Sequence, residues 1–129
     1  MLLNDINCDF LRLSVCGFSN DNVLRGRPYG GCAILFRKSL NASFKHIICN
    51  SRRMIALLME SVDVACLLIN LYMPFEDAAN DDSTDEFLVQ LTNLNNLIDQ
   101  FSDINIVIGG DLNVDFNRSA THAAVERLH

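Results

Sequence analysis

Short apolar runs separated by polar and glycine-containing segments recur along the chain, and they predict an α/β (α+β) protein with more strand than helix. Several runs alternate apolar and polar residues or are continuously apolar over a strand's length. Two of them, Val62–Tyr72 and Ile104–Ile108, are almost wholly apolar, so we expect both to be buried within a sheet. The predicted strands are Phe10–Phe18, Cys32–Phe36, Phe44–Cys49, Met54–Glu60, Val62–Tyr72 and Ile104–Ile108.

One segment between the last two predicted strands has helical spacing instead. Ser83 and Glu86 fit a capping box, which predicts that Ser83 is the N-cap of a helix of about five turns. Apolar residues then recur every three or four positions, and the stripe contains no catalytic residue type, so we expect it to pack on a sheet. The stripe consists of Phe87, Leu88, Leu91, Leu94, Leu97, Ile98 and Phe101. A second helix is predicted over Ser119–Leu128.

Composition narrows the class of protein. The 129 residues suffice for one domain with a real core, and a hydrophobic fraction of 50% is globular. The 10 basic and 16 acidic residues give a net charge of −6, which argues against a stable nucleic-acid binder more than against an enzyme, because metal sites collect carboxylates. No apolar run approaches the length of a membrane span, so we expect no membrane partner.

The cysteines indicate the compartment. Their number is odd, they are widely spread, and no CxxC or Cys/His spacing suggests zinc. They are therefore predicted to be buried, reduced thiols in an intracellular protein, nuclear or cytoplasmic. The five are Cys8, Cys16, Cys32, Cys49 and Cys66.

Candidate chemistry follows the Ile104–Ile108 run. Gly109 and Gly110 allow a sharp turn there, and Asp111 and Asn113, two residues apart, would leave an extended backbone on the same side. A carboxylate that orients water beside an amide that holds an oxygen suits phosphate-ester chemistry. The alternative is plain turn chemistry, since all these residue types favour turns.

Two further pairs of polar residues have the same two interpretations. Asn70 and Tyr72 end the Val62–Tyr72 run and can face one site, or they can be a hydrogen-bonded strand end. Arg25 and Arg27, in a glycine-containing segment, could contact a polyanion or belong to a solvated turn.

Taken together, the segments resemble the endonuclease/exonuclease/phosphatase superfamily, and most closely the apurinic-type endonuclease domain of LINE-like (non-LTR) retrotransposons. Four motifs in the same order make the resemblance specific. They are RGRPYGGCAILFRKSL (Arg25–Leu40), SRRMI (Ser51–Ile55), INLYMPF (Ile69–Phe75) and IVIGGDLNVDFN (Ile106–Asn117).

The resemblance implies a partial DNase I-like fold, a four-layer αββα sandwich with mixed, largely antiparallel sheets. It also implies that Asp111 activates the attacking water, that Asn113 and Tyr72 contact the scissile phosphate, and that Arg53 approaches the substrate backbone. Asn70, which can face the same site as Tyr72, is a further candidate substrate-binding residue. DNA is the implied substrate, Mg²⁺ or Mn²⁺ the cofactor, and a reverse transcriptase the partner in an intact element.

The chain departs from the family at its ends. Family members begin with a Gln-Glu motif whose Glu binds the metal and end with a catalytic Ser-Asp-His motif, and neither is found here. Residues 1–129 are therefore expected to be an incomplete domain whose metal ligands are unknown. His46, His122 and His129 lie in no such motif, and Phe75 replaces a common asparagine.

The sequence thus leads to the hypothesis of a metal-dependent phosphodiesterase that nicks DNA as part of a retrotransposon-derived protein. One alternative is another branch of the superfamily, acting on inositol phosphates, sphingolipid or RNA. The other is a catalytically inactive remnant that survives as a folded or binding module.

Overall fold

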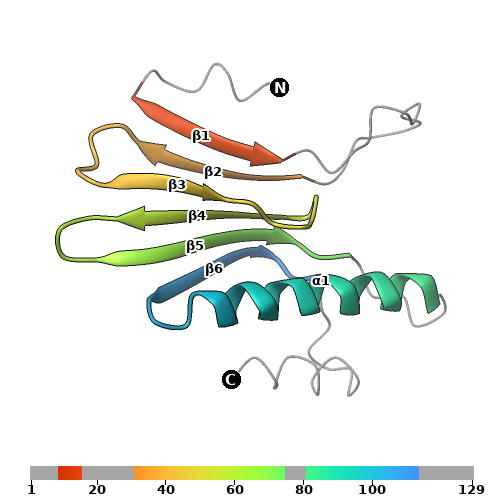
Figure 1. Ribbon diagram of the computed structural model, residues 1–129. Helices are drawn as coiled ribbons and strands as arrows, with labels where there is room; N and C mark the ends of the chain where they lie inside the picture. Colours follow the sequence, from red (N-terminus) through yellow and green to blue (C-terminus); the bar gives the residue numbers. More distant parts are fainter. Residues whose placement is uncertain (1–8, 16–30, 75–80, 114–129) are drawn as a thin grey trace.

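The computed structural model describes residues 9–15, 31–74 and 81–113, which form strands and one helix (Figure 1). The mixture of strands and helix agrees with the predicted α/β (α+β) class. In chain order the elements are β1 (Phe10–Val15), β2 (Cys32–Arg37), β3 (Ser43–Ile47), β4 (Met54–Glu60), β5 (Ala65–Tyr72), α1 (Asp81–Gln100) and β6 (Asn105–Asp111).

The strands form two sheets. Strands β1 and β2 pair antiparallel, and a four-stranded sheet has the order β3-β4-β5-β6. Its first three strands are antiparallel neighbours, whereas β6 runs parallel to β5 because helix α1 connects them. Mixed, mostly antiparallel pairing is therefore confirmed for the described residues.

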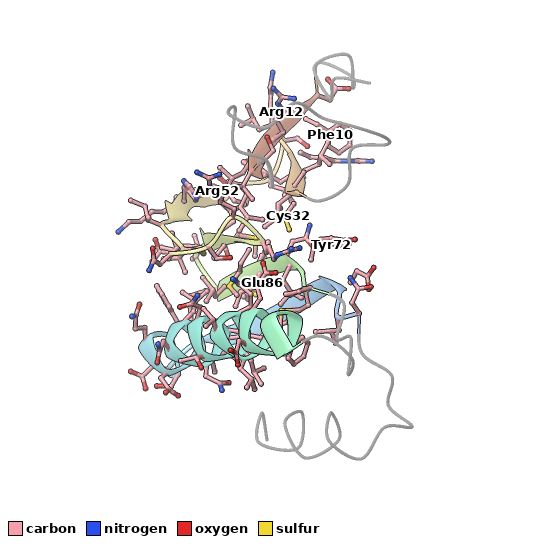
Figure 2. The ribbon with its side chains drawn as sticks, turned by 90° about the vertical axis from the view of Figure 1, so that its right-hand side faces the viewer. Phe10, Arg12, Cys32, Arg52, Tyr72 and Glu86 are labelled. Atoms are coloured by element: carbon pink, nitrogen blue, oxygen red, sulfur yellow. The ribbon has the colours of Figure 1, made fainter. Side chains whose placement is uncertain are left out.

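These elements make three layers, with the four-stranded sheet between the β1–β2 pair and helix α1 (Figure 2). On one side, the Phe36 ring of β2 stacks on the Phe44 ring of β3 with centroids 4.1 Å apart. On the other side, Phe87, Leu94 and Leu97 of α1 pack on the sheet. The fourth layer of the predicted αββα sandwich does not occur among the described residues.

The main core lies between α1 and the centre of the sheet. Leu67, Ile69 and Leu71 of β5 are at most 2% exposed and face the helix. Because side chains alternate along a strand, Asn70 and Tyr72 lie on the opposite face, toward the β1–β2 layer. Strand β5 is therefore covered on both faces, as its continuous apolar run predicts.

Helix α1 confirms the predicted packing stripe but not its predicted start. It begins at Asp81, so Ser83 lies inside the first turn and is not the N-cap. The side chain of Glu86 forms an ion pair with Arg53 instead, with 2.8 Å between Oε1 and Nε. Leu88, which was expected in the stripe, is 47% exposed.

The predicted strand bounds are met for Met54–Glu60 and shift elsewhere. Strand β5 begins only at Ala65, because the Ser61 amide donates to the Val64 carbonyl (2.8 Å) in a turn. Strand β3 ends at Ile47, one position before an 89% exposed Ile48.

Strand β6 differs most from expectation. It continues through both glycines to Asp111, so the sharp turn predicted at Gly109 and Gly110 is wrong. It is also not buried, since Val107 is 54% and Ile108 43% exposed. The physical reason is its place at an edge: among the described strands it pairs with β5 alone.

Several predictions fall outside the described residues: positions 16–18 of the first strand, Arg25 and Arg27, Cys8 and Cys16, and the Ser119–Leu128 helix. Within the described part, Cys32 and Cys66 are buried free thiols, as expected, whereas Cys49 is a free thiol that is only half-buried. No helix among the described residues is long and apolar enough to cross a membrane.

Candidate functional site

The predicted site residues gather at one edge of the four-stranded sheet. Strands β5 and β6 are parallel, so their carboxyl ends meet there, with Tyr72 in register with Asp111. Strand β4 runs the other way and begins at the same edge, directly after Arg53. The carboxyl ends of parallel strands are where open α/β sheets place ligands. We call this end of the sheet, where β5 and β6 finish and β4 begins, the candidate edge. It includes Arg53, Asn70, Tyr72, Asp111 and Asn113.

Tyr72 and Asp111 form its centre. Residues paired across parallel strands project to the same face, so both side chains lie on the face away from α1. Tyr72 is half-buried, whereas Asp111 is exposed. A phenol and a solvent-accessible carboxylate thus project from neighbouring strand ends on the same face.

Arg53 adds a positive charge to this pair. Its guanidinium carbon lies 5.9 Å from the centre of the Tyr72 ring, within the range of a cation–π contact. Its Nε donates to Glu86 of α1, and its carbonyl accepts the amide proton of Tyr72 at 2.8 Å. Figure 2 shows Glu86 at the helix, below Tyr72. The helix therefore positions the guanidinium over the ring.

Asn113 does not project beside Asp111 as predicted. The chain turns after β6, and Asn113 has a left-handed φ of 50°. Its amide nitrogen donates to Asp111 Oδ1 (3.0 Å), and its side-chain nitrogen donates to the Met73 carbonyl (2.8 Å). This is the turn geometry typical of Asp and Asn. It fixes the Asp111 carboxylate and joins the ends of β5 and β6.

Asn70 also contacts protein groups. Its side-chain nitrogen donates to the Ala33 carbonyl of β2 at 2.8 Å, which ties the candidate edge to the β1–β2 layer. Neighbouring Gly110 has a φ of 123°, and a Cβ there would lie 1.9 Å from the Leu71 carbonyl oxygen. Only glycine allows the two strands to approach so closely at this point.

The residues that hold Arg53 were not found from the sequence. The Ser51 hydroxyl donates to Gln90 Oε1 (2.6 Å) and accepts the Arg53 amide proton (2.9 Å). Cys32 donates from Sγ to the Arg53 carbonyl (3.2 Å). Burial raises the pKa of the Cys32 thiol, against the opposing effects of the Tyr72 backbone and the Arg53 charge. No spacing in the sequence indicates the contacts of Ser51 with Gln90 or of Cys32 with Arg53, because each joins segments far apart in the chain.

The charges at the edge bear on the predicted metal ion. Among the side chains that the structure describes, in residues 9–15, 31–74 and 85–113, no three or more His, Cys, Asp or Glu residues gather as metal ligands. Asp111 is a single carboxylate, and Glu86 is paired with Arg53. Mg²⁺ is usually held by one or two carboxylates with water and substrate phosphate. The described residues therefore do not fit a complete metal centre by themselves.

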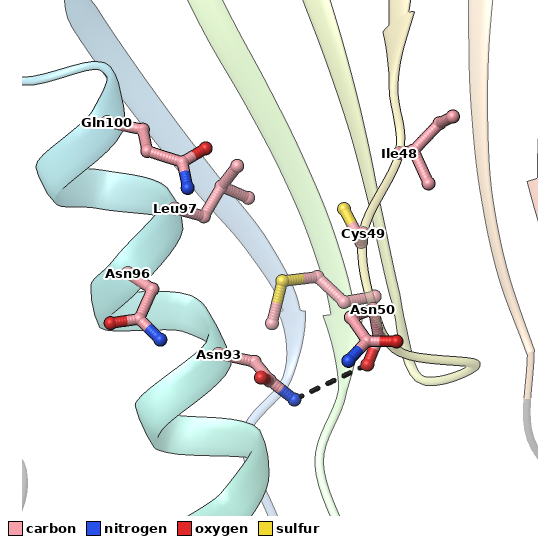
Figure 3. Close-up of a pocket in the computed structure, with 8 residues that line it drawn as sticks. Ile48, Cys49, Asn50, Asn93, Asn96, Leu97 and Gln100 are labelled. Carbon is pink, nitrogen blue, oxygen red and sulfur yellow. Dashed lines mark hydrogen bonds between the residues drawn. The ribbon is translucent and has the colours of Figure 1, made fainter.

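A separate pocket lies on the helix side of the sheet. It has a volume of about 260 Å³. The side-chain amides of Asn93, Asn96 and Gln100 on α1 face the segment 48–50 across it (Figure 3). The Asn93 side chain spans it with a 3.5 Å hydrogen bond to the Asn50 carbonyl. A neighbouring pocket of about 560 Å³ reaches Ser51, Arg53 and Glu86. Neither pocket is lined by Tyr72 or Asp111, so both are distinct from the centre of the candidate edge.

The candidate edge has the elements of phosphate chemistry. An exposed carboxylate can orient or deprotonate water, a phenol can donate a hydrogen bond to an oxygen, and a guanidinium can offset negative charge. Comparisons with family models, with curated proteins and with solved structures find no match for this chain.

Proposed function

We propose that the chain is part of a metal-dependent phosphodiesterase that nicks DNA, of the endonuclease/exonuclease/phosphatase superfamily and related to retrotransposon endonucleases. The observation that supports this most is the register of β5 with β6, which sets Tyr72 beside Asp111. The cation–π distance of 5.9 Å then adds Arg53 to the same face. In an intact element the partner would be a reverse transcriptase.

Each residue has a defined role in the proposed reaction. The Asp111 carboxylate orients a water and accepts its proton while the water oxygen bonds to phosphorus. The ester P–O bond in line with the attack breaks, and the leaving oxygen takes the bonding electron pair and then a proton from solvent. The Tyr72 hydroxyl donates to a phosphate oxygen, and Arg53 offsets the negative charge. Asn113 positions Asp111 through its 3.0 Å backbone hydrogen bond. Its side chain can reach a phosphate only by giving up the Met73 carbonyl.

A divalent ion, Mg²⁺ or Mn²⁺, belongs to the proposal because it would offset charge on the phosphate and on the leaving oxygen. The described residues offer it Asp111 alone as a free carboxylate at the candidate edge. Its other ligands would have to come from water, the phosphate or residues outside the described part.

Nicking of supercoiled plasmid tests the proposal. Wild-type protein with Mg²⁺ is compared with the same protein in EDTA, with Asp111→Ala and with Asp103→Ala, whose exposed carboxylate lies in the turn before β6. We expect Asp111→Ala to lose about 100-fold or more of the rate, a typical effect of removing a general base. Asp103→Ala should keep it. Equal nicking by all three proteins, or no nicking by folded wild type, would contradict the proposal.

One observation favours the alternative of an inactive binding module. Asn70 and Asn113 each donate from the side-chain nitrogen to a backbone carbonyl, and Arg53 donates from Nε to Glu86. A remnant of this kind would fold, because these contacts hold the layers together, and it would bind a partner without nicking DNA. The plasmid assay separates the two functions, provided that circular dichroism shows the protein to be folded.

A further inference from the structure

The charges of the chain are strongly separated along its sequence. No Lys or Arg lies between Met54 and Asn117, a stretch that holds most of the acidic residues. That stretch includes α1, whose last turn has no basic residue. The described basic residues all lie in or between the first strands: Arg12, Arg37, Lys38, Lys45, Arg52 and Arg53. The net charge of −6 therefore conceals three basic residues, Arg12, Arg37 and Lys38, in the β1–β2 layer, on the other side of the four-stranded sheet from the acidic helix.

The outward face of the β1–β2 pair carries several of these charges. Cys32 and Phe36 point toward the four-stranded sheet, so the alternate residues of β2 point away from it. In the antiparallel register Phe10 is opposite Arg37, and Arg12 is opposite Leu35. Figure 2 shows Phe10 and Arg12 on the layer farthest from α1. We call Phe10, Arg12, Leu35, Arg37 and Lys38 the basic outer face.

Its end is built around an aromatic ring. The Arg37 guanidinium carbon lies 5.6 Å from the centre of the Phe10 ring. The Lys38 backbone amide donates to the Asp9 backbone carbonyl at 2.9 Å. This hydrogen bond joins the two segments that line a shallow pocket of about 510 Å³. Asp9, Phe10, Arg37, Lys38 and Ser39 line this pocket. An aromatic ring with a guanidinium over it, beside a lysine, is a combination that accepts a stacked base and its phosphate.

The basic outer face shares strand β2 with the candidate edge. Strand β2 begins there, since Cys32 contacts the Arg53 carbonyl and Ala33 accepts a hydrogen bond from Asn70. Arg37 follows five residues later, roughly 17 Å along the strand.

We propose that the basic outer face binds single-stranded nucleic acid, with a base on the Phe10–Arg37 stack and phosphates on Arg12, Arg37 and Lys38. That the partner is a nucleic acid rests on the proposed function. The new element is the surface of the protein that holds the nucleic-acid strand. A duplex hides its base faces, so only an unpaired strand can use both the ring and the charges.

Binding of a labelled oligothymidylate of about 20 nucleotides, followed by fluorescence anisotropy in EDTA, tests the proposal without cleavage. Arg37→Gln should weaken binding about fivefold or more at low salt and lower the salt slope by about 0.7, the value for one phosphate contact. Lys45→Gln is the matched control: it is exposed and removes the same charge, but it pairs with Leu58, which packs toward α1. It should bind as wild type does. Phe10→Leu should weaken binding about fivefold or more through lost stacking.

Several results would overturn this inference. One is an equal loss of oligonucleotide affinity in Arg37→Gln and Lys45→Gln, and another is an unchanged affinity in Phe10→Leu. The others are wild-type protein that does not bind the oligonucleotide at low salt, and wild-type protein that binds anionic vesicles in place of the oligonucleotide. Asp111→Ala separates the two proposals, because it should bind the oligonucleotide normally even though nicking is lost. If nicking depends on Asp111 but oligonucleotide affinity is unchanged in Arg37→Gln, the proposed function stands and the binding role of the basic outer face is refuted.

Discussion

Strands β5 and β6 are parallel neighbours with similar apolar sequences, yet only β5 is buried. Ile69 of β5 is 2% exposed, and its register partner on β6, Ile108, is 43% exposed. Strand β5 has β4 on one side, β6 on the other, α1 over one face and β2 near the other. Strand β6 pairs with β5 alone among the described strands. The number of neighbours, not the apolar run, determines burial.

The same difference divides the candidate edge between the two strands. Tyr72 ends the buried strand and is fixed by Arg53 and Glu86 through the helix. Asp111 ends the exposed strand and is fixed by the Asn113 turn. A rigid, half-buried phenol is thus set beside an accessible carboxylate. The following changes test how far this difference between the strands extends.

The largest expected effect compares the two isoleucines. Ile69→Ala removes a core side chain and should lower the free energy of unfolding by about 3–4 kcal/mol, through lost burial and a cavity. Ile108→Ala should cost about 1 kcal/mol or less, because its side chain already contacts water. Urea denaturation measures both changes. Equal losses would contradict the assignment of β6 to an exposed edge.

The next effect is at the glycines of β6. Gly110→Ala places a Cβ against the Leu71 carbonyl at a positive φ, so we expect a loss of about 2–3 kcal/mol. Gly109→Ala is the matched control, since a Cβ there meets nothing within 4 Å, and it should change stability by less than about 0.5 kcal/mol. A tolerated Gly110→Ala would show that the two strands do not approach so closely.

A smaller effect is expected where the two strands end. Asn113→Ala removes the 2.8 Å hydrogen bond to Met73 and should cost about 1 kcal/mol. Asn96→Ala, at an exposed helix position, should instead raise stability by about 0.5 kcal/mol, because Ala has the higher helix propensity. Thermal unfolding compares the pair, and an unchanged melting temperature in Asn113→Ala would rule out the turn as a link between β5 and β6.

The smallest effect concerns Arg53 and Glu86. Both side chains are partly exposed, at 25% and 47%, so a double-mutant cycle with Arg53→Gln and Glu86→Gln should give a coupling energy of about 0.5 kcal/mol. The coupling should shrink at 1 M salt, because salt screens an exposed ion pair. A coupling that survives high salt would require a buried contact in place of the observed one.

The sequence predicts the local elements well and their surroundings less well. Met54–Glu60 and the packing stripe of α1 follow from periodicity, which is a local property. The exposure of Ile108 and the ion pair of Glu86 depend on which distant segments lie beside them, and no spacing encodes that. Similarly, the end of β5 predicts Tyr72 at an edge, but the carbonyl groups that Asn70 and Asn113 contact depend on the assembled layers.

The central claim is that the carboxylate at the end of β6 acts on a phosphodiester. Its most direct test is the rate at which Asp111→Asn cleaves a labelled DNA oligonucleotide, compared with the rates of Asp103→Asn and wild type. Equal melting temperatures of the three proteins would show that all are folded alike. Both substitutions change an exposed carboxylate to an amide of the same size, at opposite ends of β6. The account predicts that cleavage falls about 100-fold or more in Asp111→Asn alone. Cleavage that is the same in all three proteins, or absent from folded wild type, would contradict it.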